Sequence, residues 1–254
     1  MPYTIPIVEK TFRVINAIAT DGGALSMHQL AKNLEIAPSS CFRIIRTLSG
    51  EGWIAEKRTG GWELSAGLVR LLDGLAPVQK LIDAARDPLD QLVGRTHLAG
   101  KLSVRQGDNA VTVLRSDSPA GISMSGRLGA TFPLALGSSG AALSSEMSDR
   151  ELDDLITRTP ESAWKNQTRD DFLKRAVAAR EGKPILDRGS YSRHVHTASV
   201  PIHDPRGEVI GAITLLAMEG DFSEKVLPIV QRGLVACARD IEQAFNPVRT
   251  GKKP

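Results

Sequence analysis

The chain has 254 residues and a formal net charge of +3; 41% of its residues are hydrophobic, 24% are charged and only 4% are aromatic. This length forms one large domain or two of ordinary size, the composition excludes a disordered chain, and no apolar stretch approaches the ~20 residues that span a bilayer. Because no signal peptide is visible, and because Cys41 and Cys237 form neither a disulfide framework nor a metal-binding CxxC motif, we expect a cytoplasmic protein, associated with the nucleoid if it binds DNA.

Three helices are predicted at the start of the chain. Apolar residues recur at helical spacing over Val8–Ala19, and the glycine pair 22–23 stops this helix. Ser26, followed three residues later by Gln29, forms a capping-box pattern at the start of a second helix. A third helix is expected over Pro38–Glu51, because the missing N–H of proline is harmless in a first helical turn.

The third helix has two chemically different faces. One face is apolar, whereas the other carries small hydroxyls and arginines at three- and four-residue steps. A helix of this kind after a short connector is typical of a recognition helix in the DNA major groove. An ordinary amphipathic helix with a solvated basic face explains the pattern too, and residues 1–75 as a whole hold eight Lys/Arg against seven Asp/Glu. The candidate DNA-contacting residues on this helix are Ser39, Ser40, Arg43 and Arg46.

A hairpin with a basic tip follows and favours the DNA-binding interpretation. Segments 53–57 and 62–64 are predicted strands around a turn at 58–61. Lys57 and Arg58 lie at the tip, where we expect them to contact phosphates or the minor groove. Three helices and such a hairpin together indicate a winged helix-turn-helix.

From Leu98 onward the periodicity indicates an antiparallel sheet with helices packed against it, so the fold class is α+β. Turn-rich tetrads at 106–109 and 204–207 close two predicted hairpins. Before them, Pro77 is expected to interrupt a helix, with a bend or restart at Pro88. The predicted helices are 68–75, 78–95, 138–143, 149–158, 169–181 and 223–245 (the last capped by Ser223), and the predicted strands are 98–105, 110–115, 121–125, 196–203 and 208–218.

The order and spacing of these segments resemble those of the IclR family of transcriptional regulators. The resemblance implies a winged helix-turn-helix domain (1–65), a linker helix with dimer contacts (66–76) and a GAF-like effector-binding domain (77–246). The last residues (247–254) are expected from their own composition to form a flexible basic tail. Ser39, Arg43 and Ile44 differ from the residues common in the family, so no operator sequence is implied. The residues that carry the resemblance are 8–14, 25–31, 38–48, 52–54, 64–68, 127–134 and 140–142.

An effector site is expected at the start of helix 138–143. Locally, the segment Gly137–Gly140 is typical of a capped helix start whose glycines allow close packing, and also of an anion site. The resemblance favours the anion site, because family members that bind small carboxylates hold the acid group there. By the same resemblance, the site residues are Ser138, Ser139, Asp187, Thr197, Thr214 and Leu216. Thr197 and the apolar Leu216 depart from the family pattern. These departures predict an acid that is larger or more apolar than a two-carbon acid, for example an aromatic or hydroxylated one.

Two further residues are candidates for the effector site. Arg127 is expected to reach a ligand carboxylate, or to pair with a neighbouring acid. His194 and His196 are two residues apart and share a strand face, so they are able to pair on a metal, but no cysteine joins them. We therefore expect no metal and place His196 at the rim of the pocket.

These observations predict a ligand-responsive DNA-binding regulator, a repressor, that acts as a homodimer or a dimer of dimers. Its partners are double-stranded operator DNA and a small organic carboxylate that changes operator affinity, with no cofactor and no membrane partner. One alternative is a DNA-binding protein whose second domain serves only dimerisation. Another is a small-molecule enzyme, but we do not expect one, because the GxSxG, Walker, HExxH and GxGxxG motifs are absent.

Overall fold

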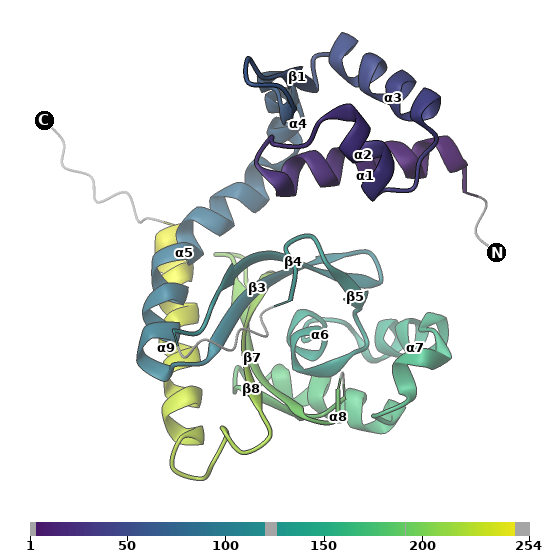
Figure 1. Ribbon diagram of the computed structural model, residues 1–254. Coiled ribbons are helices and arrows are strands. Elements are labelled where there is room, and N and C mark those ends of the chain that lie inside the picture. The colour runs from purple at the N-terminus through teal and green to yellow at the C-terminus, as the bar shows by residue number, and fades with distance from the viewer. Residues whose placement is uncertain (1–3, 120–125, 191, 247–254) are drawn as a thin grey trace, which may run out of the picture. The chain divides into compact units, whose positions relative to one another are not determined.

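The computed structural model describes residues 4–119, 126–190 and 192–246. The chain separates into two compact units, residues 1–76 and 77–254 (Figure 1). The predicted strand 121–125 and the predicted basic tail 247–254 lie outside the described residues. Among the described helices, none is both long enough and apolar enough to cross a bilayer.

The first unit contains the three predicted helices and the predicted hairpin. Its elements are α1 (Pro6–Asp21), α2 (Met27–Asn33), α3 (Pro38–Gly50), β1 (Ile54–Glu56) and β2 (Trp62–Leu64).

Local chemistry sets the helix boundaries in this unit. Gly22 ends α1 with a φ of 72°, a left-handed conformation that costs glycine little. Ser26 and Gln29 form both hydrogen bonds of the expected capping box. The buried core of the unit comprises Val14, Ile18, Leu30, Ala31, Ile36, Cys41, Ile44, Ile45, Leu48 and Ile54.

A short helical segment follows the hairpin. It consists of a 3-10 turn (Ala66–Leu68), α4 (Val69–Leu72) and a second 3-10 turn (Asp73–Leu75). None of its residues is buried in the single chain. The exposed large apolar side chains on this segment are Val69, Leu71, Leu72 and Leu75.

The second unit is built on a six-stranded antiparallel sheet with the strand order β5-β4-β3-β8-β7-β6. Helices cover both faces (Figure 1). On one face α5 (Ala76–Thr96) and α9 (Leu227–Phe245) contribute to the same buried core, and on the other lie α6 (Gly137–Leu143), α7 (Asp149–Arg158) and α8 (Arg169–Ala179). The strands are β3 (Ala99–Gln106), β4 (Asn109–Ser116), β5 (Thr131–Pro133), β6 (Ile185–Arg188), β7 (Val195–His203) and β8 (Val209–Met218).

Helix α6 is the element that brings the predicted effector residues to the sheet. All seven of its residues are buried. A Cβ atom at Gly140 would clash with the backbone carbonyl of Leu134, so only glycine permits this close approach. The sequence of this segment is typical both of a close-packed helix start and of an anion site. The structure therefore shows the close packing that glycine allows.

Three sequence predictions need correction. The strands β5 and β6, at the two edges of the sheet, were not predicted. Helix α9 begins at Leu227 rather than at Ser223, because Pro228 occupies the first turn, where a proline is favoured. Pro77 lies in the first turn of α5 instead of interrupting a helix, and α5 continues through Pro88.

Candidate DNA-binding surface and effector cavity

Helix α3 buries its apolar face and exposes its basic one. Cys41 is fully buried, and Ser39, Arg43 and Arg46 are exposed, while Ser40 is half-buried. The helix contains no acidic residue, and no ion pair involves either arginine among the described residues. Both guanidinium groups are therefore available to phosphates or base edges.

The two basic residues at the hairpin tip have different environments. Lys57 Nζ donates a hydrogen bond of 2.8 Å to the carbonyl oxygen of Gly22 and lies 3.7 Å from a carboxylate oxygen of Glu63. Its charge thus faces the C-terminal end of α1, where the helix dipole favours a cation. Arg58 is exposed and has no ion pair in the described part of the chain. The geometry favours Arg58 over Lys57 as the DNA contact of the wing.

A cavity of about 130 Å³ lies between α6 and the sheet. Apolar side chains of Phe132, Leu136 and Leu216 form part of its wall. The predicted effector residues that line it are Ser138, Ser139, Asp187, Thr197 and Leu216, and Lys101 and Thr112 join them.

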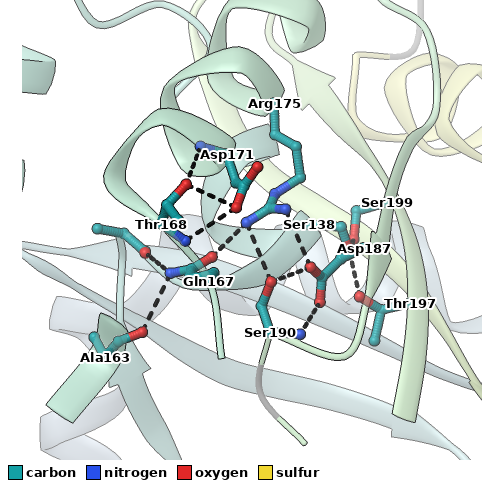
Figure 2. Close-up of polar contacts among 11 residues, drawn as sticks. Ser138, Ala163, Gln167, Thr168, Asp171, Arg175, Asp187, Ser190, Thr197 and Ser199 are labelled. Carbon is teal, nitrogen blue, oxygen red and sulfur yellow. Dashed lines mark hydrogen bonds and ion pairs between the residues drawn. The ribbon is translucent and has the colours of Figure 1, made fainter. Parts of the chain in front are cut away.

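A chain of hydroxyl groups connects α6 to the sheet beside this cavity. Ser138 Oγ lies 2.6 Å from Thr197 Oγ1 and 2.8 Å from Ser199 Oγ. Thr214 Oγ1 lies 2.8 Å from both Ser199 Oγ and Ser139 Oγ. The order is Thr197–Ser138–Ser199–Thr214–Ser139, and Figure 2 shows its first three members.

The hydroxyl chain has one proton more than its internal hydrogen bonds use. Each of five hydroxyls carries one donor, but only four contacts join them. If all the hydroxyls donate in one direction, the remaining O–H belongs to an end of the chain, Thr197 or Ser139. Both ends line the cavity, so a ligand oxygen placed there accepts a hydrogen bond.

Asp187, also at the cavity wall, is held by neighbours of its own (Figure 2). Its carboxylate accepts hydrogen bonds from the backbone N–H of Ser190, at 3.2 Å, and from the Ser190 hydroxyl, and it lies 3.3 Å from Arg175 Nη1. Arg175 in turn donates to Gln167, whose side-chain amide donates to the carbonyl of Ala135 at 2.6 Å. This cluster ties α8 to the end of β6, and it pairs the negative charge of Asp187 internally.

Lys101 is a site residue that the sequence did not reveal. It lies on β3, and its Nζ is 4.2 Å from the centroid of the Phe132 ring. Burial lowers the pKa of Lys101 to about 8. Ser199 was missed as well, although a residue two positions after Thr197 on a strand shares its face, which is a signal that could have found it.

Three predicted site residues are not among the described residues that line the cavity. Thr214 still belongs to the hydroxyl chain beside it, whereas His196 and Arg127 do not. Side chains alternate along β7, so His196 shares a face with Ala198 and Val200, which belong to the core with α5 and α9, while Thr197 faces α6. This placement corrects the expectation that His196 lies at the pocket rim. Arg127 is exposed and is not among the described residues that line the cavity.

One of the two histidines considered for a metal, His194, has an acidic neighbour, and so has His203 further along the chain. His194 Nδ1 lies 3.2 Å from Glu219, and His203 Nδ1 lies 3.2 Å from Glu242. Within the described ranges, no group of three or more His, Cys, Asp or Glu side chains is arranged to hold a metal ion.

The chain is similar to known proteins over nearly its whole length. The model of the IclR helix-turn-helix domain matches residues 7–58, and that of the bacterial transcriptional regulator IclR C-terminal domain matches residues 75–243. The HTH-type transcriptional repressor AllR of Escherichia coli K12 is 22% identical over 244 residues, which cover 94% of this chain and 90% of the relative.

Solved structures show the same fold. The IclR protein of Thermotoga maritima superimposes with a TM-score of 0.72 at 18% identity and covers 95% of this chain and 99% of its own. An IclR homologue of Microbacterium hydrocarbonoxydans, solved in complex with 4-hydroxybenzoate, has a TM-score of 0.72 at 17% identity, with coverages of 95% and 100%. The matches to both domain models show that the chain belongs to the IclR family of DNA-binding transcriptional regulators.

Proposed function

We propose that this regulator is a repressor that binds operator DNA through α3 and the β1–β2 wing, and that it responds to a small organic carboxylate bound in the cavity between α6 and the sheet. The observation that carries the proposal is the hydroxyl chain, because both of its ends, Thr197 and Ser139, line the cavity. Repression is supported by the similar AllR proteins, which are repressors. We place its action in the cytoplasm, at the operator.

The DNA-binding part of the proposal rests on two sets of residues, all of them exposed except the half-buried Ser40. Arg43 and Arg46 on α3, with Ser39 and Ser40 at its start, suit the major groove, and Arg58 at the wing suits a phosphate or the minor groove. Contacts of arginine with phosphate release counterions, so we expect operator affinity to fall steeply as the salt concentration rises.

The lining of the cavity supports an acid with an apolar body, and its volume limits that body to about one ring. A cavity of ~150 Å³ accommodates benzene in a well-studied case, and this cavity has about 130 Å³. Hydroxyl donors on one side and Phe132, Leu136 and Leu216 on the other suit an acid with an apolar body. The 4-hydroxybenzoate complex of the Microbacterium relative belongs to this chemical class.

A second copy of the chain is the proposed protein partner. Four large apolar side chains of the 69–75 segment, Val69, Leu71, Leu72 and Leu75, are between 51% and 57% exposed. An apolar cluster of this kind is typical of a surface that another protein covers. A dimer would present two recognition helices to half-sites that are ~34 Å or a multiple of this distance apart.

The proposal is tested by measuring DNA binding with and without an acid. Duplexes that the protein selects from a random library serve as operator, and glyoxylate, pyruvate, benzoate and 4-hydroxybenzoate serve as probes. We expect at least one acid to raise the melting temperature and to change operator affinity, because a ligand shifts an equilibrium only by its differential affinity for two states.

Two other outcomes would favour the alternatives. If the protein dimerises and binds operator but responds to none of the acids, the second unit serves dimerisation only. If the purified protein consumes one of the acids, the second unit is an enzyme. Against this alternative, Asp187 is the only carboxylate among the described cavity-lining residues, and Arg175 and Ser190 already occupy it.

A further inference from the structure

A cationic side chain, Lys101, also lines the cavity and is not part of the hydroxyl chain. Lys101 lies on β3, opposite Thr214 of β8 and Arg115 of β4 in the sheet register, and its side chain lines the cavity. Its ammonium group lies 4.2 Å from the centroid of the Phe132 ring. The negative face of an aromatic ring attracts a cation, so this contact favours the charged form at the cavity wall.

No carboxylate of the described chain neutralises Lys101. The ion pairs between described residues do not include it. Asp187, the one carboxylate among the described residues that line the cavity, is paired with Arg175, and the neighbouring Arg115 is itself a cation, paired with Asp117.

The parts of the chain that the structure does not describe offer no acidic side chain either. Residues 1–3, 120–125, 191 and 247–254 contain no Asp and no Glu. A largely buried ammonium group without a counterion is costly, because its hydration is lost and no opposite charge replaces it. A small anion that enters the cavity would supply this negative charge.

We propose that Lys101 pairs with the carboxylate of the effector and so selects a small organic anion over its neutral analogues. This inference rests on the proposed function, since it names the residue that recognises the charge of the proposed ligand. The acid group would meet Lys101, and the apolar body of the ligand would meet Leu136 and Leu216. An amide of the same shape would leave Lys101 without a counterion, and its binding would be weaker.

The pairing makes effector binding depend on pH. In the unliganded protein burial lowers the pKa of Lys101 to about 8, and a bound carboxylate raises it again. Binding is therefore strongest below about pH 8, where Lys101 is already charged, and weakens as the pH rises further. The other groups facing Lys101 are Arg115, Phe132 and the hydroxyls of Thr214 and Ser139, while Asp187 at the cavity wall is paired with Arg175.

The test compares Lys101→Met with the wild-type protein. Methionine keeps the apolar stem and removes the charge, so the unliganded variant is expected to melt at or above the wild-type temperature. Lys183→Met is the matched control, because Lys183 is exposed and pairs with Glu181. The probes are glyoxylate, pyruvate, benzoate and 4-hydroxybenzoate, with benzamide and 4-hydroxybenzamide as neutral counterparts, measured by calorimetric titration from pH 7 to 10.

We expect the wild type and Lys183→Met to bind at least one acid and to bind the matching amide at least tenfold more weakly. Lys101→Met should bind that acid about 10- to 100-fold more weakly and lose the dependence on pH, because the variant lacks the charged hydrogen-bond donor that pairs with the carboxylate. If Lys101→Met binds the acid as tightly as the wild type, the role of Lys101 is refuted while the proposed function stands. If the wild type binds none of the four acids, both this inference and the proposed carboxylate effector are refuted.

Discussion

The ion pair between Asp187 and Arg175 leads to a quantitative prediction about stability. Only 1% of the Asp187 side chain and 16% of the Arg175 side chain are exposed, and Arg175 Nε has no hydrogen-bond partner within the described residues. Asp187→Ala would leave a largely buried guanidinium without its counterion. Removing one partner of a buried pair costs about 3–5 kcal/mol, and the residual exposure of Arg175 favours the lower end.

The assay is differential scanning calorimetry of the full-length protein. A loss of about 3 kcal/mol lowers the melting temperature of a domain of this size by roughly 6–12 °C. Glu181→Ala is the control, because it removes an exposed pair in which 76% of Lys183 and 62% of Glu181 are accessible, and water already screens the charges of such a pair. Arg175→Met combined with Asp187→Leu should recover part of the loss. If Asp187→Ala costs no more than Glu181→Ala, the buried-pair argument is incorrect.

Three further predictions concern DNA binding, effector binding and packing. Arg43→Ala should weaken operator binding by about 1–3 kcal/mol and binding to random duplex by less, as filter binding or anisotropy would show; equal losses would identify a phosphate contact instead. Thr197→Val removes one end of the hydroxyl chain and should weaken acid binding in titration calorimetry without changing operator affinity; loss of operator binding in the folded variant would contradict this separation. Gly140→Ala should destabilise the protein by about 1–3 kcal/mol in thermal melts because of the clash with Leu134, whereas Gly94→Ala, with open space around its Cβ, should be neutral or stabilising; similar effects of the two would refute the packing argument.

The parts of the fold that short-range chemistry decides were predictable from the sequence. Capping boxes join Ser26 to Gln29 at the start of α2 and Ser148 to Glu151 at the start of α7. Each needs residues only three positions apart, and both helices begin where the sequence predicts them. The edge strands β5 and β6, of three and four residues, are different. The strands β1 and β2 are also short, but a predicted turn joins them, whereas no predicted turn joins β5 or β6 to a partner strand. Pairing with β4 and β7 alone makes these segments strands.

The contrast between short-range and long-range determinants applies to the site residues as well. A lysine within an alternating strand pattern is ordinarily expected on a solvated face. Lys101 lines a cavity because helices cover both faces of this sheet, and the coverage by α6 follows from long-range packing that the periodicity of β3 does not contain. Lys57 is similar, because its hydrogen bond to Gly22 joins residues 35 positions apart.

The alternation of the strands separates ligand recognition from the stability of the fold. On β7 and β8 the side chains of Thr197, Ser199 and Thr214 belong to the hydroxyl chain, whereas their immediate neighbours, among them Ala198 and Leu215, belong to the core with α5 and α9. A substitution on the cavity face therefore changes the chemistry offered to a ligand and leaves the other core unchanged. A substitution one residue further along the same strand would change the core with α5 and α9 and leave the cavity face unchanged.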